Sequence, residues 1–180
     1  MCSSIENLSK KFTWQFLTNQ TQSNSSVSFL TRFIATGFFS GYSPFAPGTA
    51  GSFIGLLLYF IPGFEHTLTL SIIITFTFVL GTFVSSKMEK QFGDDPSIVV
   101  IDEVVGMWIS LLFLPKTLLV AVLAFFLFRA HDIVKIPPAR QLEAVPNGFG
   151  IMLDDVVAGI YANVSVKVSL VVLEYIGLYS

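Results

Sequence analysis

The sequence predicts an all-helical bundle associated with a membrane, and three observations support this class. Hydrophobic residues make up 53% of the 180 residues and charged residues only 12%, about half of the quarter that is usual in soluble proteins. The stretches 33–64 and 67–86 contain no charged residue, and only Glu65 and His66 separate them. Two pairs of adjacent acidic residues are also embedded in apolar runs, where a carboxylate is costly unless something binds it.

Composition also narrows the partners and the compartment. The net charge is −2 and no basic stripe stands out, so nucleic acid is not an expected partner, and no obligate protein partner is evident. Cys2 is the single cysteine, which leaves no disulfide framework and no cysteine metal site. Residues 1–31 read as a polar leader with an amphipathic helix over 5–17 and a linker over 18–28, preceding a domain over 32–180. Because this leader lacks the apolar core of a secretory signal, we expect the working face in the cytoplasm.

Glycine and proline divide the first apolar stretch. We expect a short helix ending near Ser40, an irregular loop over 41–52, and a helix that begins at Thr49 or Ser52 and runs to Ile61. Free N–H groups at a helix start form an anion site, to which the hydroxyls of Thr49 and Ser52 add donors. A simple helix-breaking turn explains the same residues equally well.

The next stretch, Thr67 to Ser86, is long enough to span a bilayer, although its threonines and Gly81 fit a buried bundle helix nearly as well. After it, we expect Asp95 to cap a helix that has Pro96 at its first position. This helix carries Asp102 and Glu103 and ends before Pro115.

The acidic pairs are the centre of the sequence. Asp102 and Glu103 lie about 100° apart on a helix, and the pair Asp154 and Asp155 recurs in a similar apolar run. Small residues follow each pair by about one turn, leaving room for an ion or a close helix (Gly106, Ala158 and Gly159). A close crossing of the two helices would gather all four carboxylates, which would repel each other unless a divalent cation held them. Oxygen ligands favour Mg²⁺ or Mn²⁺ over zinc.

A second set of charged residues follows the apolar segment 118–128, which is too short to cross a bilayer alone. Arg129, Asp132 and Lys135 are spaced by three residues, so we expect them on one helix face. They form either a surface ladder of ion pairs, or a phosphate site in which Arg129 and Lys135 neutralise the anion and Asp132 positions them or binds metal. We assign His131 a structural role. A short polar helix over 140–143, a turn over 146–150, the second acidic helix and a last helix over 164–179 complete the chain.

Four stretches together resemble a known family: Gly41–Ser52, Ile101–Trp108, Phe128–Lys135 and Met152–Gly159. In content and order they are similar to the phosphatidylglycerophosphatase A family, over about residues 32 to 165. The resemblance implies a bundle of about six core helices. It also implies a Mg²⁺-dependent phosphatase of the bacterial inner membrane that converts phosphatidylglycerophosphate to phosphatidylglycerol and inorganic phosphate.

The expected site follows from both lines of reasoning. The predicted catalytic residues are all acidic (Asp102, Glu103, Asp132, Asp154 and Asp155), and the four carboxylates of the two acidic pairs are also the predicted ligands of one or two Mg²⁺ ions. Arg129, Lys135, Thr49 and Ser52 are predicted to bind the phosphate. We assign no catalytic role to 95–97. Attack by water and an aspartyl-phosphate route both remain open. The rival functions are a cation transporter that uses the buried carboxylates, and a phosphatase of the same fold that acts on a soluble ester.

Overall fold

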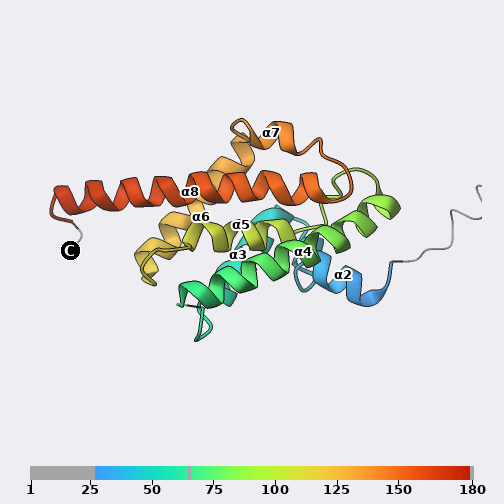
Figure 1. Ribbon diagram of the computed structural model, residues 1–180, viewed down its shortest axis with the longest axis horizontal. Helices are drawn as coiled ribbons and strands as arrows, with labels where there is room; N and C mark the ends of the chain where they lie inside the picture. Colours follow the sequence, from blue (N-terminus) through green and yellow to red (C-terminus); the bar gives the residue numbers. More distant parts are fainter. Residues whose placement is uncertain (1–26, 65, 179–180) are drawn as a thin grey trace, which may run out of the picture.

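The computed structural model describes residues 27–64 and 66–178, and all regular secondary structure within these two ranges is helical (Figure 1). The amphipathic helix predicted over 5–17 and most of the leader lie outside the described residues. The elements are, in order, α2 (Phe29–Ala35), the 3₁₀ helix η1 (Ser40–Tyr42), α3 (Pro47–Tyr59), α4 (Thr67–Phe92), α5 (Ile101–Leu111), α6 (Leu118–Val134), α7 (Ala139–Leu142) and α8 (Phe149–Tyr175). The predicted all-helical class is confirmed.

Helix α5 is the centre of the bundle. Figure 1 shows the two long helices, α4 and α8, on opposite sides, with α3, α5 and α6 between them. Val105, Met107 and Leu111 of α5 are almost fully buried, and α3, α4, α6 and α8 all pack against this helix. A helix that is covered on every side has no solvent-facing stripe, which explains its nearly unbroken apolar run.

The predicted close crossing of the two acidic helices is confirmed. A Cβ atom on Gly106 would lie 2.5 Å from the ring of Phe128 and 2.8 Å from the carbonyl oxygen of Asp155, and one on Gly159 would lie 2.5 Å from the carbonyl oxygen of Gly106. Ala158 is 1% exposed in the same contact. The space beside Gly106 is therefore filled by α8 and Phe128 and is not an ion site.

Several predicted boundaries are wrong, mostly because helices continue further than expected. The last helix does not begin at Val164, because α8 is continuous from Phe149 to Tyr175, and no glycine or proline interrupts it after Gly159. Helix α4 continues past Ser86 to Phe92 and ends at Gly93, whose φ is +94°. In contrast, the first helix ends at Ala35 and not near Ser40. Helix α3 begins at Pro47, a position that a proline favours.

The prediction that Asp95 caps the helix of Asp102 is also wrong. That helix begins at Ile101, with Val100 as its N-cap residue, and the Val100 N–H donates to the carbonyl of Ala35 at 2.9 Å. The backbone of Val100 is thus tied to the end of α2, which fixes where α5 starts. Asp95 instead has a φ of +45° in the preceding loop.

Two of the described helices, α4 and α8, are long and apolar enough to cross a membrane by length and composition. Exposed apolar side chains follow one stripe of α4, at intervals of three or four residues (Leu68, Ile72, Phe76, Val79 and Phe83). Helices α3 and α5 begin at the end of the bundle where α4 and α6 end. Residues from the starts of α3 and α5, from the end of α6 and from the loop after α4 line one cleft, which places the candidate site at this end of the bundle.

Candidate active site

A cleft of about 230 Å³ lies at the end of the bundle where α3, α5 and α8 begin. A cleft of this volume has room for a phosphate group and associated ions. The lining residues are Ala46, Pro47, Gly48, Asp95, Ser97, Val99, Asp102, Glu103, Arg129, Asp132, Lys135, Asp154 and Asp155.

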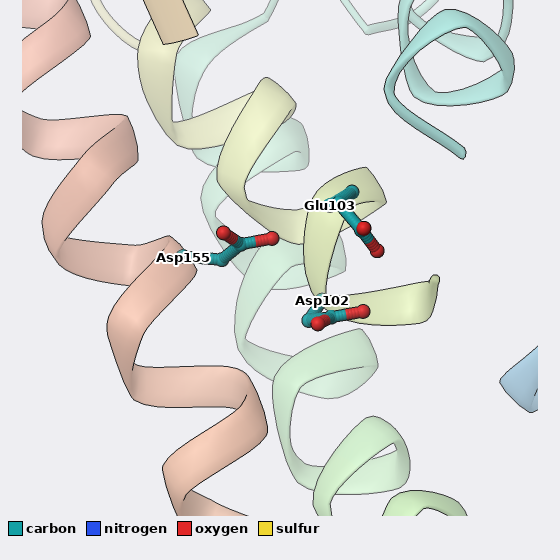
Figure 2. Close-up of side chains that lie close together, drawn as sticks. All are labelled: Asp102, Glu103 and Asp155. Atoms are coloured by element: carbon teal, nitrogen blue, oxygen red, sulfur yellow. The ribbon is translucent and has the colours of Figure 1, made fainter. Parts of the chain in front are cut away.

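Three carboxylates converge in this cleft. Asp102 and Glu103 extend from the first turn of α5, and Asp155 reaches toward them from α8 (Figure 2). One oxygen of each lies within 4.8 Å of the others. Each residue also has a buried oxygen that meets no hydrogen-bond donor in the described part of the chain: Asp102 Oδ1, Glu103 Oε2 and Asp155 Oδ2. Leaving a buried acceptor unsatisfied costs about 1–3 kcal/mol, and more when it is charged, so this arrangement requires a cation or protons.

The electrostatics of the α5 pair lead to the same conclusion. Burial raises the pKa of Asp102 well above its ordinary value, and the neighbouring charges of Glu103 and Asp155 raise it further. Burial also raises the pKa of Glu103 to about 7, although a hydrogen bond with Asp102 and the charge of Arg129 oppose this. Without a cation, these side chains therefore hold protons at pH values where carboxylates are normally ionised.

A second acidic group shares Asp155 with the first. Oxygens of Asp132, Asp154 and Asp155 also lie within 4.8 Å of one another, but two of the three already have a cationic partner. Asp132 pairs with Arg129 at 2.8 Å, and Asp154 pairs with Lys135 at 3.1 Å. The four carboxylates predicted to meet are thus divided, with Asp154 in the second group and its charge compensated by Lys135.

Lys135 does not share a helix face with Arg129 and Asp132, so that prediction is wrong. It is the C-cap residue of α6, with a left-handed φ of +48°, and this conformation turns its side chain toward Asp154 and toward Glu143, which it meets at 2.8 Å. Burial alone would lower the pKa of Lys135, but the hydrogen bonds with these two carboxylates raise it above its ordinary value. Lys135 therefore stays charged at the edge of the cleft.

Arg129 is held in place from two sides. Its Nη1 atom lies 2.8 Å from Asp132 and donates to Ser52 Oγ at 3.2 Å, and Ser52 in turn donates to the carbonyl of Gly48 at 2.8 Å. A Cβ atom on Gly48 would collide with the carboxylate of Glu103 and would lie 3.0 Å from the guanidinium of Arg129. Gly48 therefore allows Glu103 and Arg129 to meet over the start of α3.

Only two of the four predicted phosphate-binding residues line the cleft. Arg129 and Lys135 line the cleft, whereas Thr49 and Ser52 are absent from its lining, and Ser52 contacts Arg129 instead. Sequence reasoning missed the start of α3 (Ala46, Pro47 and Gly48) and the loop residues Asp95, Ser97 and Val99. Pro47-Gly48 was a readable signal, because a proline favours the first helical position and a glycine permits close approach.

The charge balance limits the chemistry of this cleft. In its described lining, six carboxylates face only two basic side chains, and both of these are paired with carboxylates. A cleft of this kind repels an anion unless cations enter with it. The donors are all oxygens, which is the ligand type that Mg²⁺ prefers, so the residues present fit a hard divalent cation.

Comparison with known proteins identifies relatives along most of the chain. A family profile described as Phosphatidylglycerophosphatase A matches residues 33–170. A Bacteroides thetaiotaomicron protein provisionally named phosphatidylinositol-3-phosphatase is 45% identical over 151 residues, which cover 79% of this chain and 94% of the relative. Proteins named phosphatidylglycerophosphatase A from Haemophilus influenzae and Escherichia coli K12 are 42% and 36% identical, over 74% and 71% of this chain and 84% and 76% of their own lengths. No solved structure matches.

Proposed function

The chain belongs to the phosphatidylglycerophosphatase A family of phosphatases, and from this premise we propose that it hydrolyses the terminal phosphate monoester of phosphatidylglycerophosphate with the help of Mg²⁺. The products are phosphatidylglycerol and inorganic phosphate. The observation that carries the metal dependence is the set of three buried, unsatisfied carboxylate oxygens that converge from α5 and α8.

Asp102, Glu103 and Asp155 are the residues that would hold the Mg²⁺ ion, with Asp154 and Asp132 beside them. When bound, Mg²⁺ supplies positive charge that polarises the phosphoryl group and lowers the pKa of water. The charge of the bound ion would also overcome the repulsion between this acidic cleft and a phosphate group, which carries a charge of about −1.5 to −2 near pH 7.

The chain's own residues orient the phosphate. Asp132 and Ser52 hold the guanidinium of Arg129 at the cleft, and a fixed guanidinium matches the geometry of phosphate oxygens. The first turn of α3 lies in the same wall, where its N–H groups favour an anion. Lys135 contributes a second positive charge at the edge, shared with Asp154 and Glu143.

We place the protein at the bacterial inner membrane, with the cleft on the cytoplasmic side. The cleft would accept the head of a lipid, and the apolar helices α4 and α8 would remain in the bilayer. Lys87, Lys90 and Arg140 are exposed at the cleft end, whereas Lys116 and Lys167 lie toward the other end, near Ile61 and Phe113. Basic residues concentrate on the cytoplasmic side of membrane proteins.

The test is release of inorganic phosphate by the purified full-length protein in mixed micelles. We expect turnover of phosphatidylglycerophosphate with Mg²⁺, none with chelator, and none in Asp102→Asn or Asp155→Asn variants. Asp94→Asn is the matched control, because Asp94 is exposed and outside the cleft. Wild-type turnover in both site variants, or indifference to chelator, would remove the acidic group from the reaction.

Phosphatidylinositol 3-phosphate is a second candidate substrate, favoured by the name of the Bacteroides relative. The same assay with this lipid, and with glycerol 3-phosphate as a soluble ester, separates the three substrate classes. We expect the highest kcat/KM for phosphatidylglycerophosphate. Release only from the inositol lipid would move the assignment to that substrate, and release only from glycerol 3-phosphate would indicate a soluble one.

A further inference from the structure

Five aromatic side chains on α2, η1 and the turn between them form a contiguous patch, here called the aromatic cluster (Phe29, Phe33, Phe38, Phe39 and Tyr42). The ring centroids of Phe33 lie 4.9 Å from Phe38 and 5.4 Å from Phe39, and Phe39 continues the contacts to Phe29 at 5.7 Å and Tyr42 at 6.2 Å. All but Phe33 are exposed, from 40% at Phe39 to 74% at Phe29. An exposed apolar patch of this kind marks an interaction surface.

The exposure of these rings is fixed by the backbone. Phe38 and Phe39 have φ values of +57° and +68°, a conformation that bulky residues rarely adopt. It is held by hydrogen bonds from the Phe38 N–H to the Phe33 carbonyl at 3.0 Å and from the Phe39 N–H to Thr36 Oγ1 at 3.2 Å. Thr36 is fully buried and also donates to the Arg32 carbonyl. The fold therefore accepts backbone strain in order to present these rings outward.

The aromatic cluster is next to the cleft. Gly41 packs against the carbonyl of Ile98 and the side chain of Val100, just before α5 and its acidic pair. At the end of η1, the chain continues through Phe45, which is 85% exposed, directly into Ala46, which lines the cleft. Figure 1 shows α2 beside the second half of α4, the half that leads to the cleft.

Charge and continuity identify the occupant as an anionic lipid surface. Residues 29–45 contain Arg32 and no acidic residue, and the guanidinium of Arg32 lies 5.6 Å from the ring centroid of Phe92. Phe92 ends α4, whose last turns also carry the exposed Lys87 and Lys90 beside Glu89. The exposed apolar stripe of α4 runs along the same helix. Aromatic rings and basic side chains are the combination found at the headgroup level of membranes.

We propose that the aromatic cluster docks at the headgroup level of an anionic bilayer and thereby sets the cleft mouth at the height of the lipid headgroups. The role of this docking rests on the proposed function, because a cleft that binds the headgroup of a lipid must lie at the height of the headgroups. Docking itself is measured without turnover, so that failure of the docking and failure of the proposed activity are distinguishable.

The direct test measures the depth of single labels on the full chain in nanodiscs that contain anionic lipid. In a Cys2→Ser background, which removes the only cysteine, a fluorescent label is attached at Phe39→Cys, Phe76→Cys or Gln141→Cys. Phe76 lies on the α4 stripe and Gln141 is an exposed residue of α7. We expect the label at 39 to lose fluorescence with lipids brominated near the headgroup, the label at 76 with deeply brominated lipids, and the label at 141 with neither.

A label at 39 that behaves like the one at 141 would overturn the proposal, as would energy transfer between labels on two copies without any quenching by lipid. A second measurement uses the variant Phe38→Asn/Phe39→Asn, because asparagine tolerates a left-handed backbone. We expect KM for a bilayer-embedded substrate to rise about tenfold, with no change for a short-chain substrate dissolved as monomers. Equal KM values for the bilayer substrate in this variant and wild type would also overturn it.

Discussion

The crossing of α5 and α8 brings the carboxylates of the proposed metal site together, and Gly106→Ala tests whether that close approach is required. The new Cβ atom would lie 2.5 and 2.6 Å from two ring carbons of Phe128 and 2.8 Å from the carbonyl oxygen of Asp155. Carbon atoms at favourable separation are about 3.5–4.0 Å apart, so the ring of Phe128 on α6 and the backbone of α8 at Asp155 must both move away from α5, by about 0.5–1 Å. Overpacking of this kind costs about 1–3 kcal/mol, and the better helix propensity of alanine returns up to about 1 kcal/mol.

The expected net loss of stability is therefore about 0–3 kcal/mol, whereas the expected loss of function is large. A displacement of about 1 Å in a reacting group costs about a hundredfold in rate. We expect kcat/KM for phosphatidylglycerophosphate to fall by about that factor, and the increase in Tm caused by Mg²⁺ to be lost because Asp155 moves away from the α5 pair.

The matched control is Gly81→Ala on α4. Its Cβ atom would clash only with the flexible end of Met152, at 2.8 Å, which can move aside at little cost, and would make an ordinary contact with Ile101 at 3.5 Å. Phosphate release and thermal unfolding with and without Mg²⁺ are measured for both variants. Wild-type turnover and a wild-type Mg²⁺ response in Gly106→Ala would refute the reasoning, because the carboxylates would then not depend on the spacing of the two helices.

Three further outcomes follow from the same geometry. Asp155→Asn removes an unsatisfied buried charge, so we expect a higher Tm in chelator together with no stabilisation by Mg²⁺; a lower Tm in chelator would contradict the assignment. Ser52→Ala removes the acceptor that holds Arg129. We expect kcat/KM to fall about tenfold, the equivalent of about 1.4 kcal/mol for a hydrogen bond to a charged group, while Mg²⁺ still raises Tm. Loss of this increase in Tm would mean that Ser52 mainly supports α3. Finally, the pKa of Glu103 is raised to about 7, above its value in the unfolded chain. Ionisation of Glu103 then destabilises the metal-free fold, so its Tm in chelator should fall as pH rises from about 5 to above 7. Mg²⁺ should therefore stabilise the protein more at pH 8 than at pH 6. Equal stabilisation by Mg²⁺ at these two pH values would exclude Glu103 as a ligand.

The sequence predicted the core of the site because its signal there is local. A carboxylate pair inside an apolar run, followed by small residues at helical spacing, determines both which face of α5 meets α8 and what lies at the crossing. The apolar run is explained by the burial of α5, and Gly106 and Gly159 are explained by backbone contact. These conclusions need only helix periodicity and the cost of a buried charge.

The position of Lys135 and the start of α5 depended on backbone conformations that the local sequence does not predict. Lys135 has the right spacing to share a face with Arg129, yet a left-handed turn at the end of α6 directs it to Asp154. Asp95 is of a residue type that often caps helices, but the hydrogen bond between Val100 and Ala35 fixes the helix start five residues after Pro96. Contacts between segments distant in sequence decided both cases, and no local pattern encodes them.

The directions of the helices would explain how a cleft with so few basic residues accommodates a phosphate group in the proposed function. Helices α3 and α5 both begin in its wall, and each helix start carries a partial positive charge of about half an elementary charge. On α5 this charge stabilises Asp102 and Glu103, which occupy the first turn. On α3 the first turn carries no acidic side chain, so its N–H groups remain available to an anion. In the proposed function, α5 and α8 would therefore present oxygens to a cation, and α3 with Arg129 would present donors to the phosphate.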